Sequence, residues 1–459
     1  MLLKRYFLSV MALILLLLGI VFTFSFVIDP YGLYGNSKII GVNNIKPVMI
    51  NHARMIKAYK VNAEEPKTIL LGSSTVEVGL NPDSKMLSDY PKPIYNLGLS
   101  GALEYEIYRY LQESLIKGNL KSVIFELHFT SYANKKNEVG FKEERLTANQ
   151  KGNKRSQVAI SYNHLQDLVE HSISSTAIID MLKTFAYSFM NKPAVIYYAN
   201  GQRNIDHWKQ DLDSKSGYGG SFYLSNLEAK IKQKLAHTCS GDFDELQNVA
   251  ELKGSKRQIL YLSKILNLVK NNNLNMKVFI SPEHVWALEN LVGEGQWASY
   301  EDWKRKVVAV IDEFNIKNPE TALTLWDFSG YNSITTEFVP PVGDLNRRMN
   351  NYLDFRHYAP PIGDRILNKI SDKHQKNHVD DDFGMRISGD NIESHLAELR
   401  FTRQKYVSSQ PQNALAAYAE GYLKRTETDC NKLTNLYNIY TKDFHGNTKK
   451  ILQLTEYDE

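Results

Sequence analysis

The chain has 459 residues, of which 43% are hydrophobic and 23% charged, a composition typical of globular proteins and not of disordered or fibrous ones. Its net charge of +4 is small for this length, and no dense run of Lys and Arg occurs, so nucleic-acid binding is not indicated. The two cysteines, Cys239 and Cys430, form no zinc-binding pattern, and the sequence leaves open whether they pair.

The N-terminus predicts a membrane anchor. Lys4 and Arg5 precede an uncharged stretch from Tyr6 to Ile28, which at about 1.5 Å per residue is long enough to cross a bilayer core of roughly 30 Å. The alternative is a cleaved signal peptide, but its apolar core usually has about 7 to 15 residues and ends in small residues, whereas this run ends in FSFVI. We therefore expect an uncleaved single-pass helix with a cytoplasmic N-terminus, and export of everything after Asp29.

Short apolar runs then alternate with helical patterns. Buried strands are predicted at 68–72, 93–98, 122–127, 277–281 and 323–327. Helices are predicted at 104–117, 258–270, 300–314 and 359–370. This alternation predicts an α/β fold with a mostly parallel sheet covered by helices, whose ligand site lies beyond the C-terminal ends of the strands.

Composition divides the chain into five parts. A cytoplasmic tip and transmembrane anchor (1–28) is followed by a juxtamembrane segment (29–66), an α/β domain (67–131 and 249–371), a Tyr-, Asn- and Lys-rich, largely helical insertion or cap (132–248), and a C-terminal appendage (372–459) with helices predicted at 413–423 and 431–440. In the insertion, His164, Asp167 and His171 share one helical face. No metal-binding motif surrounds them, and no metal is predicted.

Two segments at predicted strand ends, and one just before the last predicted helix, contain residues suited to catalysis. Ser74 follows the first strand in the turn GSST, where a serine is open to a ligand, although serine also commonly caps a helix. The second strand leads into NLGLSG, whose Gly101 backbone N–H can stabilise an oxyanion, although turn glycines are common. Asp354 precedes His357 by three residues in DFRHY, a spacing that lets the carboxylate orient the imidazole as a general base.

Together these segments resemble the conserved blocks of the SGNH/GDSL hydrolases. GSS matches the block of the nucleophile, with Ser74 in its place and Ser73 replacing an Asp. NLGLSG places Gly101 at the oxyanion-hole glycine, and DFRHY matches the closing D-x-x-H block. The resemblance covers 68–131 and 258–371. It implies a three-layer, flavodoxin-like core and a catalytic triad of Ser74, His357 and Asp354 that uses no cofactor.

The third block of the family departs from the pattern. Its Asn, an oxyanion donor, is missing from ELHFTSY, where Thr130 falls nearest by spacing and His128 lies beside it. A further segment, SPEH at 281–284, ends the predicted fourth strand. Its Ser, Pro and Glu read as a helix start, but His284 is also a candidate for substrate binding.

The resemblance to membrane-anchored bacterial members of this family implies a serine esterase or O-acyltransferase of the inner membrane, with its bulk in the periplasm. It would act on an envelope polysaccharide or an acyl donor and work with a membrane-bound O-acyltransferase. Because the block-three Asn is missing, a catalytically inactive protein that binds carbohydrate or assists assembly is the alternative from another class. A plain esterase or lipase is a second enzymatic alternative.

Overall fold

The computed structural model describes residues 2–129, 140–192, 197–205, 217–220, 222–223, 225–226, 253–293, 295–341, 343–371 and 381–409. The predictions that concern Thr130, Cys239, Cys430 and the helices at 413–423 and 431–440 lie outside these residues. The chain divides into two compact units. The first unit comprises Met1–Pro66, Arg109–Leu120 and Val139–His207, and the second comprises Lys67–Tyr108, Lys121–Glu138 and Trp208–Glu459.

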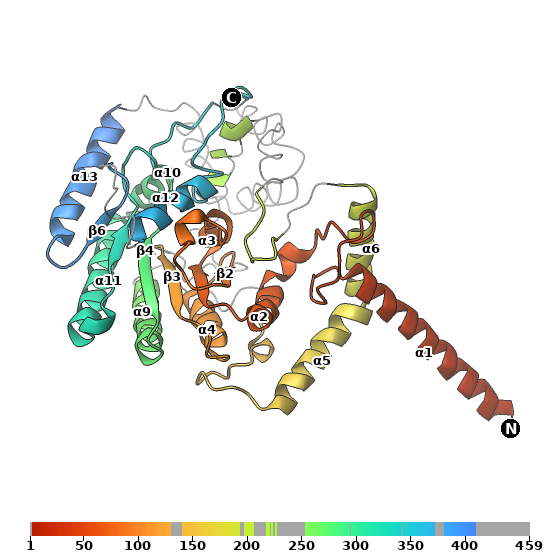
Figure 1. Cartoon of the computed structure of the whole chain (residues 1–459). Coiled ribbons are helices and arrows are strands. Elements are labelled where there is room, and N and C mark those ends of the chain that lie inside the picture. Colours follow the sequence, from red (N-terminus) through yellow and green to blue (C-terminus); the bar gives the residue numbers. More distant parts are fainter. Residues whose placement is uncertain are drawn as a thin grey trace. The chain divides into compact units, whose positions relative to one another are not determined.

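The first unit is helical in the part that the structure describes. It joins the juxtamembrane segment to part of the predicted insertion, a grouping that the sequence did not indicate. Its elements are α1 (Leu2–Ile28), η1 (Met49–His52), α2 (Ala53–Glu64), the C-terminal half of α4 (Glu104–Leu115), η3 (Glu143–Arg145), α5 (Gln157–Ile173) and α6 (Ser175–Phe189) (Figure 1). Within α1, Leu3–Ile28 is long and apolar enough to cross a membrane, as the predicted anchor requires.

The second unit is built on a six-stranded sheet. Five parallel strands are followed by one antiparallel edge strand in the order β2-β1-β3-β4-β5-β6. Their bounds are β1 Thr68–Gly72, β2 Ile94–Gly98, β3 Ser122–Leu127, β4 Asn275–Ile280, β5 Leu325–Asp327 and β6 Met385–Ile387. β1, β2 and β5 are buried throughout, which explains their nearly continuous apolar sequences. The predicted α/β class with a mostly parallel sheet is therefore confirmed.

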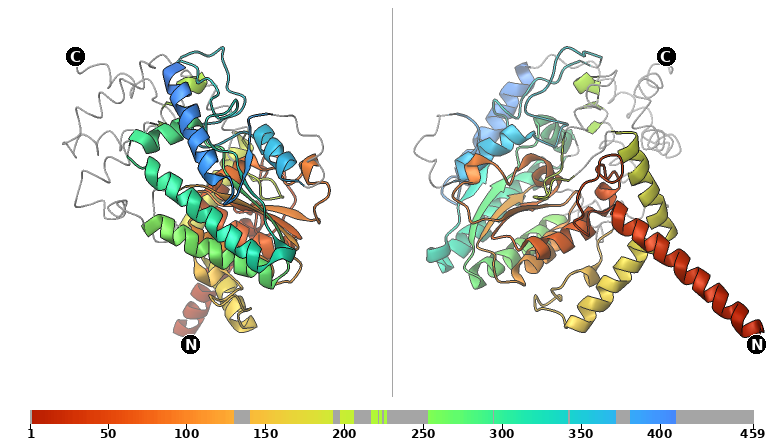
Figure 2. Two further views of the ribbon diagram at one scale, coloured as in Figure 1. Left: turned by 90° about the vertical axis from the view of Figure 1, so that its left-hand side faces the viewer. Right: turned by 45° about the vertical axis from the view of Figure 1, so that its right-hand side comes forward.

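Helices cover both faces of this sheet. α9 (Lys253–Asn271) packs against α11 (Trp297–Lys317) on one face, and α3 (Ser74–Gly79) packs against α12 (Pro360–Ile370) on the other (Figure 2). α10 (Val285–Gly293) and α13 (Ile392–Ser409) complete the unit, with the short η2 (Lys85–Leu87) and η5 (Pro319–Thr321). The chain order reverses at β1, which lies between β2 and β3, and ligands of such sheets bind at this reversal.

The boundary predicted at 371/372 is wrong for residues 381–409, because this segment belongs to the α/β unit. β6 pairs with β5, and His395 on α13 donates a hydrogen bond from its Nε2 to the Asp327 carboxylate at 2.7 Å. Lys304 of α11 forms a fully buried ion pair with the same carboxylate. The prediction failed because β6 has only three residues and two of them are exposed, so its sequence lacks the apolar run of a buried strand.

Candidate active site

The turn after β1 places Ser74 as the first residue of α3. Ser73 is the N-cap, and its hydroxyl accepts a hydrogen bond from the Thr75 N–H. Gly72 is required here, because a Cβ at this position would lie 2.6 Å from the Val76 side chain and 2.7 Å from a carboxylate oxygen of Glu126. Ser74 itself is half-buried, with Ser73 and Thr75 buried on either side. The tight turn therefore presents one hydroxyl at the C-terminal edge of the sheet.

Glu126, near the end of β3, anchors this turn through hydrogen bonds. Its carboxylate accepts hydrogen bonds from the Ser73 N–H at 2.9 Å, from the Ser73 hydroxyl at 2.9 Å and from the Thr75 hydroxyl. The residue is 2% exposed, so water cannot substitute for it. Sequence reasoning treated SVIFEL only as a strand and missed this role. The signal was a single acidic residue in an otherwise apolar, buried run.

The opposite side of the site is the short loop before α12. Asp354 Oδ1 accepts hydrogen bonds from the backbone N–H groups of Arg356 and His357, each at 2.8 Å. Asp354 Oδ2 lies 2.7 Å from Nδ1 of His357, and Nε2 of the same ring lies 2.8 Å from the Ser74 hydroxyl. A carboxylate only accepts, so Nδ1 carries the proton and Nε2 faces Ser74 as an acceptor. The predicted contact between Ser74 and His357 is present.

The charge of Asp354 is stabilised despite its burial. Burial alone raises the pKa of this carboxyl, but the charge of His357 and hydrogen bonds from its ring and from two backbone N–H groups outweigh burial. The result is a pKa below the ordinary value of 3.8. Asp354 is therefore ionised at neutral pH and stabilises positive charge on the imidazole.

Close backbone contacts fix the two halves of the site against each other. A Cβ on Gly363 of α12 would lie 1.9 Å from the Gly79 carbonyl oxygen of α3. A Cβ on Gly79 would lie 2.1 Å from the ring of Tyr358, the residue after His357. Only glycine permits this approach of α12 to α3. Helix α3, which begins at Ser74, therefore packs closely against α12 and against the loop that carries His357.

The loop after β2 completes the edge of the site. The buried Asn96 side chain donates to the carbonyls of Val76 and Leu80, both at 2.8 Å, which fastens α3 to β2. Gly98 lets the chains meet, since a Cβ there would lie 2.4 Å from the Glu77 nitrogen. Gly101 follows in an exposed turn with a φ of +64°, a conformation that favours glycine. Its role as an oxyanion donor stays a prediction.

His284 was a candidate for substrate binding, but the structure places its side chain in the core. The side chain is fully buried, its Nε2 bonds to the Glu337 carbonyl at 2.9 Å, and its ring packs edge-on against Phe222 and Tyr352. Burial lowers the pKa of His284 to about 4, so the ring is neutral at pH 7. The residue fills the core beneath the site. Ring packing of this kind has no local sequence signal.

Its neighbour Glu283 lies within electrostatic reach of the site instead. Burial raises the pKa of Glu283, whereas the charges of Arg356, His128 and His357 lower it in part. His128, half-buried just beyond β3, uses its carbonyl to accept a bond from Gln258 at 3.2 Å. The prediction that the His128 side chain binds substrate stays a prediction. Of the SPEH segment, Glu283 therefore interacts electrostatically with His357, whereas the His284 side chain is buried in the core.

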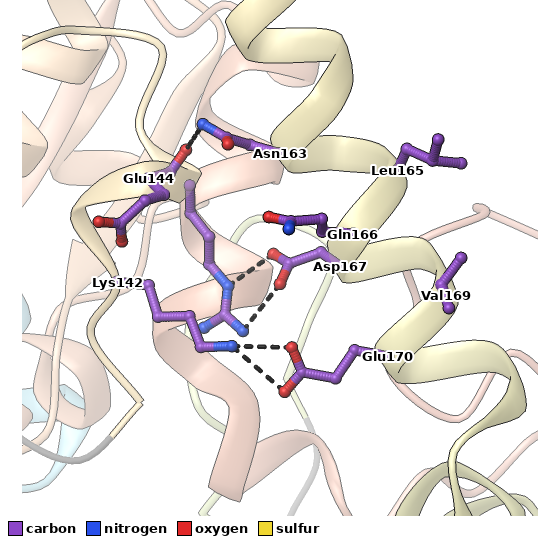
Figure 3. A pocket seen from close by; sticks show the side chains of 9 residues that line it. Lys142, Glu144, Asn163, Leu165, Gln166, Asp167, Val169 and Glu170 are labelled. Carbon is purple, nitrogen blue, oxygen red and sulfur yellow. Dashed lines mark hydrogen bonds and ion pairs between the residues drawn. The ribbon is translucent and has the colours of Figure 1, made fainter.

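In a pocket of the first unit, charged side chains of the lining form ion pairs with one another (Figure 3). Arg145 bonds Asp167 through Nε at 2.6 Å, and Lys142 bonds Glu170 at 2.8 Å. Asp167, Glu170 and His171 bring possible metal ligands within 4.8 Å of one another. The cations neutralise both carboxylates, and His171 Nδ1 bonds the Asp167 carbonyl at 2.8 Å. The cluster is explained by packing and gives no support to a metal site.

Fold and site together define an α/β protein with a Ser-His-Asp relay at the C-terminal edge of a parallel sheet. No model of a known protein family matches the chain, and no curated protein matches it significantly. Membership of the SGNH/GDSL family therefore stays a prediction from the three sequence segments.

Proposed function

We propose that this protein is a membrane-anchored serine esterase or O-acyltransferase that acts on ester-linked acyl groups of an envelope polysaccharide. The observation that supports it is the continuous relay from Asp354 through His357 to Ser74, with contacts of 2.7 and 2.8 Å. Such a relay activates a serine hydroxyl as a nucleophile. No metal or organic cofactor is required by this chemistry.

The reaction has two halves. Ser74 Oγ attacks the carbonyl carbon of the acyl donor while His357 Nε2 takes the hydroxyl proton. The C–O bond to the donor breaks, and the leaving oxygen receives that proton, which leaves an acyl-serine. A glycan hydroxyl or water then attacks the acyl group, again with His357 as base, and Ser74 recovers its proton. The N–H groups of Ser74 and Gly101 are the proposed oxyanion donors.

The anchor supports the location of the substrate. Lys4 and Arg5 precede the apolar part of α1, and basic residues at this place favour a cytoplasmic N-terminus. The α/β unit would then lie outside the cytoplasm, where envelope polysaccharides are modified. An acyl donor supplied at the membrane by an O-acyltransferase fits this arrangement. A C-terminal alkaline phosphatase fusion should be active, and an active cytoplasmic reporter at the same point would contradict the topology.

A fluorophosphonate probe tests the catalytic part of the proposal. The full-length protein in membranes should be labelled, because the relay lets Ser74 Oγ displace fluoride from the probe. Ser74→Ala should abolish labelling without loss of fold, since this hydroxyl is half-buried and bonds only to His357 among the described contacts. Ser73→Ala is the matched control and should keep labelling, although its lost cap weakens the turn.

Outcomes of this experiment separate the candidate functions. An unlabelled wild-type protein would favour the inactive, carbohydrate-binding alternative. Labelling that survives Ser74→Ala would place the nucleophile elsewhere. If Ser74 is labelled, the acyl content of cell-envelope glycans distinguishes the two reactions: the Ser74→Ala strain should have less acyl glycan if the enzyme transfers, and more if it hydrolyses.

A further inference from the structure

Helix α6 is amphipathic, but its apolar face is exposed and its polar face is buried. Its exposed face is an apolar stripe at helical spacing, formed by Ile178 (37% exposed), Leu182 (55%), Phe185 (39%) and Phe189 (73%). The buried face, in contrast, is mainly polar and consists of Ala177, Asp180, Met181, Thr184 and Ser188. A helix on a water-exposed surface shows the reverse pattern. The stripe therefore faces something other than water.

Helix α5 repeats the pattern. Val158 (80% exposed), Tyr162 (59%), Leu165 (59%) and Val169 (46%) lie four, three and four residues apart and form one exposed stripe. On the other side of the helix, Asp167 and His171 are buried and bonded. Contiguous exposed apolar surface on this scale marks an interaction site.

Buried hydrogen bonds fix the rotation of both helices. Asp180 of α6 accepts from the Tyr31 hydroxyl at 2.9 Å, and Ser188 bonds the Ile45 backbone at 3.0 Å. On α5, Ser172 pairs with the Tyr34 hydroxyl at 2.8 Å. Turning either helix to bury its apolar stripe would break these contacts and leave buried polar groups without partners, which is unfavourable. The outward orientation of the stripes is thus built into the fold.

The occupant follows from the neighbouring helix. α1 packs against both α5 and α6, and its contact is at its C-terminal end, where Ser25 and Ile28 are buried while most of the helix is exposed. Figures 1 and 2 show α5 running crosswise to α1 near that end. If α1 crosses a bilayer, its C-terminal end lies at the membrane surface. The stripes then lie at the level of the lipid headgroups and the first part of the acyl chains.

We propose that α5 and α6 are interfacial membrane helices, whose apolar stripes insert into the outer leaflet around α1. With 17 and 15 residues they are about 25 and 22 Å long, less than the roughly 30 Å needed to cross the bilayer, so they lie in its surface. The first unit is then a three-helix membrane platform. This inference rests on the proposed insertion of α1 and is independent of the chemistry of Ser74.

Environment-sensitive labels on stripe and control residues test this directly. In a full-length Cys239→Ser/Cys430→Ser background, single cysteines at Tyr162 and Leu182 place an NBD dye on each stripe. Gln157 and Lys183 are the controls, because both are exposed and lie outside the stripes. The proteins are reconstituted into vesicles of phosphatidylethanolamine and phosphatidylglycerol, with or without doxyl-labelled lipid.

The dyes at 162 and 182 should emit at shorter wavelength and be quenched by doxyl lipid, whereas those at 157 and 183 should emit as in water. Equal emission and quenching at stripe and control positions would overturn the proposal. A blue-shifted emission without quenching by doxyl lipid would also overturn it. If that shift increased with the protein-to-lipid ratio, a second copy of the chain would cover the stripes. Shielding found only in native membranes would instead indicate a protein partner. Fluorophosphonate labelling of the same samples reports the Ser74 site separately, so the two proposals can fail independently.

Discussion

Replacing Asp354 by Asn tests how the relay is controlled, because the wild-type carboxylate uses its two oxygens differently. Oδ1 accepts hydrogen bonds from two backbone N–H groups, and Oδ2 accepts one from the Nδ1–H of His357. The amide has only one oxygen. If that oxygen stays with the backbone, the NH2 group points at Nδ1 and forces the ring proton onto Nε2. An Nε2–H cannot accept the Ser74 proton, so this tautomer is inactive.

The contacts set the size of the effect. The opposite amide orientation keeps the productive tautomer but loses two backbone hydrogen bonds, each worth about 1 kcal/mol net. The inactive orientation is therefore favoured by about 2 kcal/mol, which reduces the active fraction about 30-fold. Loss of the carboxylate charge beside the imidazolium adds to this. We expect a decrease in rate between about 30-fold and about 10,000-fold.

The assay is the second-order rate of fluorophosphonate labelling at neutral pH, with thermal unfolding as the control for folding. Asp354→Ala is the comparison, because alanine presents no NH2 group and leaves the ring free to adopt either tautomer. Asp354→Ala should lose more stability than Asp354→Asn, since both backbone N–H groups lose their acceptor, but it should be labelled faster. An Asn variant labelled within a few-fold of wild type, or more quickly than the Ala variant, would refute the tautomer argument.

Three further predictions concern the supports of the site. Glu126→Ala leaves the buried Ser73 N–H without its acceptor, so it should lower the free energy of unfolding by about 3 kcal/mol and slow fluorophosphonate labelling. Glu126→Gln keeps one acceptor oxygen and should have a smaller effect in both assays. Gly98→Ala should cost about 1–3 kcal/mol by thermal unfolding, because its Cβ would overlap the α3 backbone, whereas Gly293→Ala, with open space around it, should be nearly neutral. Burial lowers the pKa of His284 from 6.5 to about 4, so the unfolded chain binds a proton between these pH values while the folded chain does not. The free energy of unfolding should therefore fall by about 3 kcal/mol as the pH is lowered from 6.5 towards 4. His284→Gln should flatten the measured dependence of stability on pH, and an unchanged slope would contradict the assignment.

The parallel sheet could be predicted because its strands are buried on both faces. TILLG and IYNLG are short, apolar and closed by glycine, and both strands were found where the sequence placed them. The relay could be predicted because Asp354 and His357 are close in sequence and Ser74 lies at a strand end. In each case the signal was local. Long-range contacts, such as the one between Glu126 and Ser73, leave no such signal.

Helix α6 shows a second limit. Periodicity identifies which residues of a helix share a face, and the stripe at 178, 182, 185 and 189 is evident in the sequence. It does not reveal which face points inward, because that depends on partners elsewhere in the chain. Here the partners are polar groups such as Tyr31, which bonds Asp180. A burial rule calibrated on water-soluble proteins would place the stripe inside.

Two carboxylates fix the Ser74–His357 pair. Glu126 binds the N–H and the hydroxyl of Ser73, next to Ser74, and Asp354 binds two main-chain N–H groups and the His357 ring. Ser74 and His357 are therefore positioned through main-chain hydrogen bonds to these two carboxylates, which come from β3 and from the loop before α12. A site that only bound carbohydrate would gain nothing from a histidine whose free nitrogen is held 2.8 Å from a serine hydroxyl. Such preorganisation matters when a proton must move between those two atoms during the reaction. The geometry for this reason favours catalysis over the binding alternative, even though the block-three Asn is missing.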